Sequence, residues 1–490
     1  MKNFNVAGNF QARVFIFREG VFRCNVSPEF FECMAIDSLA QDRGDITKIE
    51  CPSPTKYGEF QEVYSFSGEL SRVTTTVTTY MSRVSLSDFF KLFLDDCPFD
   101  MHVHFGECQN PTDFTQFDSA LIFEDVRATS WGTDPLIALQ SADKGIIQET
   151  MDISARRVLQ LVNLYYTEVS TNVTVDGGFV KSVVADSRSC GGNCDNPSNG
   201  CQTQFAVTDD GYLYYTVDGG YVWAAEQVID TAVETTAIPI DMAVVGDSIL
   251  ILTADDQVYV GSRREFLLSP STATWDATDV SSALTVNAMD GTLNNGLIVG
   301  QSGTVASVNI YGDVEIVEDG ALTSEHLLSV HLNQDGTALT GGANGALLFS
   351  VDNGDTWDAP TSPTTDDIVS VWAKSNRNWL IGTDAGAVWC TDDAGATWAR
   401  VSFPGWGTAT APVLDIKGNS SHVLYMLQNN RVLKSIDGGS SWTVEPSNSK
   451  KTFPTGTWAS IAACSDDINT VTVVGVNAAT GIIVRGNPIN

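Results

Sequence analysis

The chain offers few residues whose types and spacing could carry out chemistry. His102 and His104 lie two apart in the stretch MHVHF, which places both imidazoles on one face of a strand, a spacing that metal sites use. The sequence holds five histidines and no evident third ligand, so we favour an ordinary strand face over a metal site. Phosphate-binding glycine loops, G-x-S-x-G and C-x-x-C are absent from the sequence. The chain therefore does not look catalytic.

Ten cysteines leave the redox compartment of the protein open. The loop CGGNCDNPSNGC holds Cys190, Cys194 and Cys201 but no apolar side chain that could pack against a core. A disulfide within this loop is the expected tie, and the alternative, a zinc site, would need a fourth ligand that no nearby His supplies. Cys390 and Cys464 lie in strand-like apolar runs, where we expect them to be small core residues.

A phrase of the form S/T-x-D-x-G-x-x-W occurs four times in the C-terminal part of the chain. Its Asp, Gly and Trp positions are Asp218, Gly220 and Trp223; Asp352, Gly354 and Trp357; Asp393, Gly395 and Trp398; and Asp437, Gly439 and Trp442. The carboxylate can accept hydrogen bonds from backbone N–H groups of its own turn, Gly can take a positive φ, and Trp can pack across the hairpin. We therefore interpret the phrase as a structural hairpin turn, in preference to a ligand site.

The spacing of the repeats indicates the architecture. Asp352, Asp393 and Asp437 are 41 and 44 residues apart, and Asp218 precedes Asp352 by 134, which is about three such steps. Two units that keep the strand but lack most of the turn phrase fill that gap, and a last strand of the same type ends the chain. Seven units of roughly 40 to 50 residues with several short strands each are typical of a β-propeller.

The sequence thus predicts a seven-bladed β-propeller over residues 170–490. The last unit stops after its inner strands. A strand at 170–177, STNVTVDG, is expected to complete it and close the ring, which would remove exposed sheet edges.

The four hairpins resemble the repeats of Asp-box propellers, a group that includes sialidases, sortilin-type sorting receptors and photosystem assembly factors. The resemblance implies the fold of residues 170–490 and no particular activity, because one fold hosts many functions. A sialidase needs several arginines around a carboxylate pocket and a Tyr nucleophile, whereas residues 171–490 contain only seven Arg, spread through strands and turns. Glycan hydrolysis is therefore the least favoured function, and we expect neither catalysis nor a cofactor.

Residues 1–169 are expected to form an antiparallel β-sandwich or barrel with one packed helix. Alternating or β-branched stretches predict strands at 11–18, 70–84, 99–106, 120–131, 145–154 and 156–166. At 85–96 apolar side chains recur at helical spacing, Ser85 can cap the first turn, and Pro98 follows the end. The region therefore differs in kind from the repeats that follow it.

The order of these elements, with CPFDMHVHFGECQNPTDF at 97–114 followed by LIFEDVRATSWGTDPLIALQSADKGIIQETMDIS at 121–154, resembles tail tube proteins of tailed bacteriophages. In that family the subunit joins its neighbours, usually as a hexameric ring, into a stacked, continuous β-barrel. The resemblance implies a virion tail protein made in the host cytoplasm. Its partners would be further copies of itself, other tail proteins and the passing genomic DNA, and the propeller would be an outward-projecting decoration.

The charge balance is compatible with a DNA conduit. The sequence holds 60 acidic and 27 basic residues, with a net charge of −33; residues 1–170 contribute 24 and 14, and residues 171–490 contribute 36 and 13. No basic cluster is large enough to hold a phosphate backbone, so we do not expect tight nucleic-acid binding, while an acidic wall would let DNA slide. The start lacks the apolar core of a signal peptide and no 18 apolar residues run together, so we expect a soluble protein with no membrane partner.

The main alternative function belongs to the binding class. In that interpretation the protein is a virion or surface adhesin, the propeller recognises a host glycan or protein, and residues 1–169 serve as an anchor. Assembly into stacked rings would favour the tail tube over the adhesin.

Overall fold

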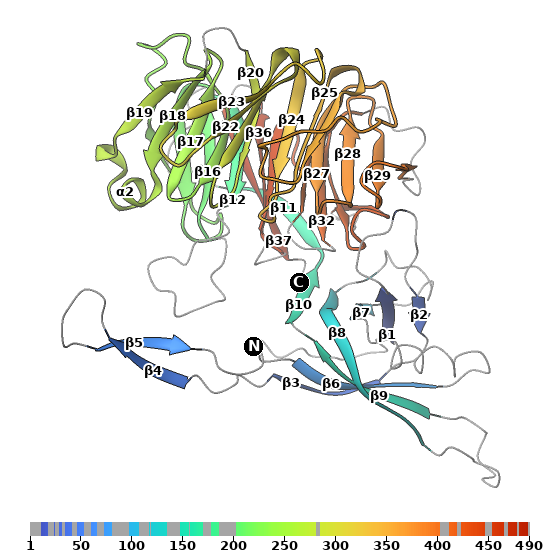
Figure 1. Ribbon diagram of the computed structural model, residues 1–490. Helices are drawn as coiled ribbons and strands as arrows, with labels where there is room; N and C mark the ends of the chain where they lie inside the picture. The colour runs from blue at the N-terminus through green and yellow to red at the C-terminus, as the bar shows by residue number, and fades with distance from the viewer. Residues whose placement is uncertain are drawn as a thin grey trace. The chain divides into compact units, whose positions relative to one another are not determined.

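The computed structural model describes most of the repeat region and the strands of the preceding region (Figure 1). The described residues are 11–17, 24, 29–31, 35–41, 47–52, 60–65, 73–80, 98–106, 117, 119–134, 148–155, 157–169, 178–185, 202–280, 285–401, 411–418, 423–445, 453–464, 469–477 and 480–488. The helix expected at 85–96 lies outside these residues. No helix within them is long and apolar enough to span a membrane.

The chain divides into two compact units. The N-terminal unit comprises Met1–Val21 and Ser27–Val162, and the propeller unit comprises Phe22–Val26 and Asn163–Asn490. The division at Val162 lies seven residues before the boundary at 169 that the sequence indicated. It falls inside the run 156–166, which was expected to be one strand.

The N-terminal unit is a large antiparallel sheet, with strand order β2-β1-β7-β8-β9-β6-β3 and with β10 also paired to β8. The strands are β1 (Gln11–Phe17), β2 (Glu29–Phe31), β3 (Ala35–Gln41), β6 (Val73–Tyr80), β7 (Phe99–Gly106), β8 (Ser119–Asp134), β9 (Gln148–Ala155) and β10 (Arg157–Val162). A separate two-stranded sheet consists of β4 (Thr47–Pro52) and β5 (Phe60–Ser65). Strands were therefore predicted correctly at six of these places, while β2 to β5 were not foreseen.

Strand β8 joins the two halves of this sheet. Its first half pairs with β7 and β10, and its second half pairs with β9. Between the halves Asp125 has a positive φ of 51°, and its N–H donates to Asp100 Oδ1 at 2.6 Å. A non-glycine residue in that conformation is costly, so the Asp100 carboxylate stabilises the change of direction. The buried core of the unit lies on these strands and includes Met101, Val103 and Phe123.

The propeller unit consists of consecutive antiparallel sheets of three or four strands; seven such sheets occur among its described residues. In chain order they are β12 (Val180–Ala185) to β15 (Ala224–Gln227), β16 (Pro239–Val245) to β19 (Trp275–Asp279), β20 (Val286–Gly291) to β23 (Val314–Asp319), β24 (Leu327–Leu332) to β26 (Leu347–Ser350), β27 (Ile368–Ala373) to β30 (Ala399–Arg400), β31 (Val413–Gly418) to β34 (Thr443–Glu445), and β35 (Thr457–Ala463) to β37 (Thr480–Pro488) with β11 (Leu164–Glu168).

The strands between these ends complete the sheets. They are β13 (Gln204–Thr208), β14 (Tyr212–Thr216), β17 (Ser248–Thr253), β18 (Gln257–Ser262), β21 (Gly296–Gly300), β22 (Thr304–Val308), β25 (Ala338–Gly342), β28 (Trp379–Thr383), β29 (Val388–Thr391), β32 (Leu424–Gln428), β33 (Arg431–Ser435) and β36 (Val471–Asn477). Helix α2 (Arg263–Leu268) follows β18 in the second sheet.

The sheets pack face to face around a common centre. Strands β21, β25, β28 and β32 are buried at every position, because neighbouring sheets cover both of their faces. The innermost strands contact one another in the order β12, β16, β20, β24, β27, β31, β35 and back to β12. The sheets therefore form a closed circle, which is the architecture of a β-propeller.

Strand β11 completes the last sheet. Its residues Leu164–Glu168 pair antiparallel with Val484–Pro488 of β37. The expected closing segment, 170–177, lies outside the described residues, and the edge of β37 is already occupied by β11. The closing strand is therefore an earlier one than predicted. Only Asn163 separates it from β10, so the run that was predicted as one strand contributes β10 to the N-terminal unit and β11 to the propeller unit.

Candidate functional site

The repeated turn binds its own backbone through a fixed set of hydrogen bonds. In the turn around Asp352, Oδ1 accepts from the Thr356 N–H at 2.9 Å and from the Ser350 hydroxyl at 2.7 Å, while Oδ2 accepts from the Thr356 hydroxyl at 2.6 Å. The Ser350 hydroxyl oxygen accepts from the Gly354 N–H at 3.0 Å. The Trp357 indole N–H donates to the Gly354 carbonyl at 2.8 Å. Both carboxylate oxygens thus hold the turn.

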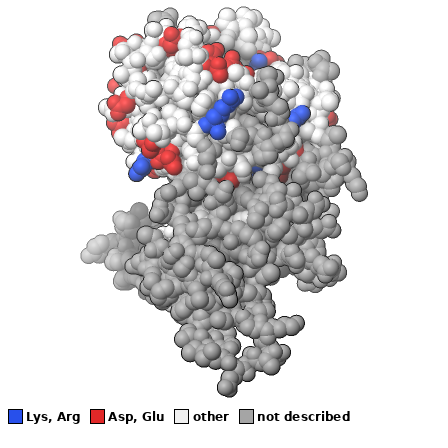
Figure 2. Space-filling model, turned by 90° about the vertical axis from the view of Figure 1, so that its right-hand side faces the viewer, with Lys and Arg blue, Asp and Glu red and all other residues white. Residues whose placement is uncertain are grey.

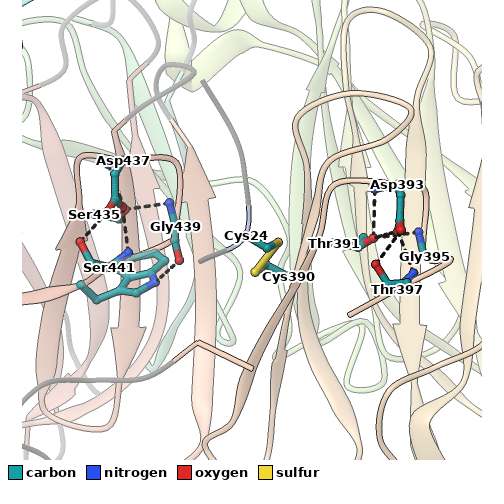
Figure 3. The surroundings of a disulfide bond; sticks show 11 residues. Cys24, Cys390, Thr391, Asp393, Gly395, Thr397, Ser435, Asp437, Gly439 and Ser441 are labelled. Carbon is teal, nitrogen blue, oxygen red and sulfur yellow. Dashed lines mark hydrogen bonds between the residues drawn. A yellow bond between two sulfur atoms is a disulfide. The ribbon is translucent and has the colours of Figure 1, made fainter. Parts of the chain in front are cut away.

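The turns around Asp393 and Asp437 repeat this arrangement (Figure 3). Their carboxylates accept from the N–H and hydroxyl groups of Thr397 and Ser441 at 2.6 to 2.9 Å. The third tryptophan differs, because Trp398 donates to the Thr361 carbonyl at 3.0 Å instead of to its own turn. The geometry gives the repeated Asp a structural task in each of these turns.

The glycine of the phrase is required for two reasons. Gly354 and Gly439 have φ values of 89° and 98°, which disfavour any residue with a Cβ. A Cβ on Gly354 would lie 2.6 Å from Leu297, and a Cβ on Gly439 would lie 2.6 Å from Leu380. The turn therefore also needs a small residue, since it packs against the core of the preceding sheet.

The turns differ in their electrostatic surroundings. The hydroxyl of Thr356 is the main cause that lowers the pKa of Asp352, and that of Thr397 lowers the pKa of Asp393 in the same way. Burial instead raises the pKa of Asp437, although its hydrogen bonds to Ser441 oppose the shift. Asp437 is 5% exposed. The same phrase therefore lies in solvent-accessible surroundings twice and in buried surroundings once.

A buried ion pair fixes the closing strand β11. The Lys434 ammonium forms a salt bridge with Glu445, and both side chains are 1% exposed. Glu445 also accepts from the Leu164 N–H at 3.3 Å and from the Tyr166 hydroxyl at 3.1 Å, while Lys434 donates to the Asn163 side chain at 3.1 Å. Burial, followed by the Glu445 charge, raises the pKa of Tyr166. These contacts of the pair with Asn163, Leu164 and Tyr166 fix the start of β11 and the residue before it.

A belt of side-chain acceptors joins the innermost strands. Each innermost strand has a free edge whose buried N–H groups need partners. The acceptor and N–H pairs are Asp241 with Met289, Asp290 with Leu332, His331 with Ala373, Ser370 with Ile416, and Asp415 with Ile461, at 2.8 to 3.2 Å. Five successive strands are thus bound to the next by one side chain each.

The belt also carries charge. Burial raises the pKa of Asp241 to about 6 and lowers the pKa of His331 to about 4. The lowered value agrees with a neutral imidazole whose Nδ1 accepts from Ala373. Burial opposes the charge of Lys417, but the carboxylates of Asp415, Asp290 and Asp241 raise its pKa overall. One lysine therefore compensates several inward-facing carboxylates.

Sequence reasoning missed this belt. Its acceptors are Asp, Asp, His, Ser and Asp in successive strands, so no repeated letter marks them. The signal that could have found them is a polar residue that interrupts each largely apolar innermost strand, such as Asp241 in PIDMAVV and Asp415 in VLDIKG.

His102 and His104 lie on β7, as expected, and both are completely buried. Their rings pack against aromatic neighbours: His104 against Phe15 and Phe117, and His102 against Phe17, with centroids 4.7 to 4.9 Å apart. Within the described part of the chain no group of three potential metal ligands occurs. The surroundings are those of a packed strand face.

The cysteine predictions were partly wrong. Cys390 is buried, but it forms a disulfide with Cys24 (Figure 3). Cys464 is disulfide-bonded as well. Cys24 lies in the segment Phe22–Val26 of the propeller unit and packs against the core of β29 to β34. An apolar neighbourhood made Cys390 look like a core residue, because its partner is 366 positions away in sequence. Cys190, Cys194 and Cys201 lie outside the described residues.

Arg485 has structural partners as well. Arg485 is 7% exposed, and its Nε donates to the Gly219 carbonyl at 2.7 Å. Its guanidinium lies 3.7 Å from the ring centroid of Tyr221. Arg485, on strand β37 of the last sheet, thereby binds the turn of the first repeat. On the face that Figure 2 shows, acidic side chains of the described residues occur in several separate groups.

Two family profiles match parts of the chain. Residues 321–485 match a family described as the DUF6242 beta propeller domain, and residues 197–382 match the photosynthesis system II assembly factor YCF48. Together the matches cover most of the propeller unit and support its fold. No curated protein matches the chain significantly.

Solved β-propellers are similar to the chain at low sequence identity. YCF48 from Cyanidioschyzon merolae is 15% identical with a TM-score of 0.48, and a structure of YCF48 bound to D1 peptide is 11% identical with a TM-score of 0.49. The WD40 repeats of RRP9 are 8% identical with a TM-score of 0.48. These comparisons cover 66% of this chain and 98%, 95% and 98% of the respective structures.

Proposed function

We propose that the protein is a tail tube subunit of a tailed bacteriophage virion, whose N-terminal unit assembles into stacked rings and whose C-terminal unit is a seven-bladed Asp-box propeller carried as a decoration. The observation that carries this proposal is a contrast in sheet edges. Among the described residues β3 pairs only with β6, and β10 pairs only with β8, so the N-terminal unit offers edges for pairing with other copies. The innermost strands of the propeller instead form a closed circle.

The lengths of the edge strands support this division of roles. Strands β3 and β10 contain 7 and 6 residues. The outermost propeller strands β11, β15, β19, β23, β26, β30 and β34 contain 5, 4, 5, 6, 4, 2 and 3, so all of them except β23 are shorter than either. A longer edge offers more backbone groups to a partner strand. The seven consecutive sheets and the shared hydrogen bonds of the turns support the blade number and the Asp-box assignment.

The acidic balance supports a conduit that repels DNA. The N-terminal 170 residues hold 24 acidic and 14 basic residues, so a lumen wall of this composition would repel phosphates. We accordingly propose that DNA passes without tight binding, and that the chain acts without catalysis.

Electron microscopy of the purified full-length protein tests the proposal. We expect rings that stack into tubes. Gln160→Lys, which places a charge on the exposed face of edge strand β10, should reduce ring formation. The matched change Ala277→Lys on the outer propeller strand β19 should leave the rings intact. A full-length protein that stays monomeric at all concentrations, while its propeller binds a host glycan or protein, would support the adhesin instead.

A further inference from the structure

The first repeated turn departs from the other three at one position. The fourth residue after the Asp is Thr356, Thr397 or Ser441 in the later turns, and its hydroxyl donates to the second carboxylate oxygen at 2.6 Å in each. In the first turn this position holds Val222. Valine has no donor, so the first turn cannot make that hydrogen bond.

The substitution changes what the first turn presents to solvent. The hydrogen bonds described for Asp218 all end on Oδ1, which accepts from the Thr216 hydroxyl and from the N–H groups of Tyr221 and Val222 at 2.7 to 3.1 Å. Three large apolar side chains are exposed beside it: Val217 by 58%, Tyr221 by 59% and Val222 by 49%. We call Val217, Asp218, Tyr221 and Val222 the first-turn patch.

Buried contacts hold the backbone that carries the first-turn patch in a fixed position. Trp223 is fully buried, and its indole N–H donates to the Gly220 carbonyl at 3.2 Å. Arg485 binds the Gly219 carbonyl and lies against the Tyr221 ring, while the Gly219 N–H donates to the Gln202 carbonyl at 2.9 Å. A rigid apolar surface loses little conformational entropy when a partner binds.

We propose that the first-turn patch is a docking site for a cationic, apolar polypeptide segment of a partner protein. An apolar side chain of the partner would pack on Tyr221 and Val222, and a neighbouring Lys or Arg would pair with Asp218 Oδ2. This interaction surface is independent of ring assembly by the N-terminal unit.

Charge decides the class of partner. Residues 171–490 carry 36 acidic and 13 basic residues, a net charge of −23, so a second propeller would be repelled. A basic segment would be attracted, and Oδ2 offers it a carboxylate oxygen that no turn hydroxyl occupies. Exposed apolar groups beside such an oxygen favour a segment that carries both apolar and basic side chains.

Fluorescence anisotropy with the full-length protein and labelled peptides tests the proposal. The probe is a short peptide of alternating Lys and Leu, and the comparison peptides alternate Glu with Leu and Lys with Ser. We expect the Lys–Leu peptide to bind at least about tenfold more tightly than either comparison. Val222→Thr should lower its affinity about tenfold, equivalent to about 1.4 kcal/mol, while leaving the melting temperature equal or higher, because the new hydroxyl can bind Asp218.

Thr356→Val is the matched control, because it removes the same hydroxyl from the second turn and should leave peptide affinity unchanged. Equal affinities of the wild type and Val222→Thr for the Lys–Leu peptide would overturn the proposal. So would equal binding of the Lys–Ser peptide, which would show attraction by charge alone. A change in the sedimentation of the full chain caused by Val222→Thr would overturn it in favour of a second copy as the occupant.

Discussion

The turns around Asp352 and Asp437 share one sequence phrase and one set of hydrogen bonds, but they lie in different surroundings. The Asp352 turn is partly exposed in the middle of the propeller sequence, and its hydrogen bonds lower the pKa of the carboxyl group. The Asp437 turn is buried in the sheet next to the closing strand, and burial raises the pKa. The phrase thus determines the shape of the turn, and its position in the ring determines how much stability depends on it.

The sharpest test of this comparison removes the closing strand itself. A fragment of residues 170–490 lacks β11, whereas a fragment of residues 163–490 retains it. We expect the shorter fragment to be less stable by on the order of 5 kcal/mol, because it loses buried Leu164 and Tyr166 and the partners of Glu445. Thermal unfolding and light scattering of both fragments measure this. Two fragments of equal stability would show that β11 does not close the propeller.

The ion pair beneath the closing strand should give the next largest effect. Glu445→Ala leaves the Lys434 ammonium buried without its charge partner, and we expect a loss of about 3 to 5 kcal/mol in the free energy of unfolding. Urea unfolding measures it. The double variant Lys434→Met with Glu445→Met should recover most of the loss, since it buries no charge. A loss below about 1 kcal/mol for Glu445→Ala would contradict the role assigned to the pair.

Direct comparison of the two turns should give a smaller difference. Asp437→Ala leaves buried donors without an acceptor, and we expect a cost of about 2 to 3 kcal/mol, against about 1 kcal/mol for Asp352→Ala, whose donors can reach water. Chemical denaturation of both variants provides the values. An equal cost at the two sites would mean that the position in the ring has no influence on the turn.

The pH dependence of stability should separate the turns with the smallest effect. The folded-state pKa of Asp437 is raised above 3.8, so its contribution is complete below that pH and is lost as pH rises through the folded-state pKa. The pKa of Asp352 is lowered, so its contribution is present above pH 3.8 and is lost as pH falls through the folded-state value. The difference in melting temperature between Asp437→Asn and the wild type should therefore change with acidic pH in the opposite direction to the difference between Asp352→Asn and the wild type. Parallel curves for the two variants would contradict these assignments.

The sequence predicted the local structure of the repeats well, because each step of that inference is local. Asp, Gly and Trp act within eight residues, and their hydrogen bonds close inside one turn, apart from the one that Trp398 donates to Thr361. The same reasoning could not find the partner of Cys390, since Cys24 is distant in sequence and its contact depends on the tertiary fold. The belt from Asp241 to Asp415 escaped for the same reason, because each acceptor serves a neighbouring sheet.

The N-terminal unit shows a second limit of sequence reasoning. The run RRVLQLVNLYY at 156–166 has the residue pattern of one continuous strand, yet β10 ends at Val162 and β11 begins at Leu164. Nothing in its composition marks Asn163 as a boundary, because both halves are strands and only their partners differ. Pairing partners, and therefore the division into units, are properties of the assembled fold.

The disulfide between Cys24 and Cys390 makes the chain a mechanical loop. If the protein is pulled from its two ends, tension passes directly from one cysteine to the other, and the residues between two cysteines 366 positions apart bear no load. Those positions would add roughly 1,200 Å of contour length at about 3.4 Å per residue. That length stays hidden from an extending force until the bond is reduced, so an oxidised subunit could be stretched only through residues outside the loop.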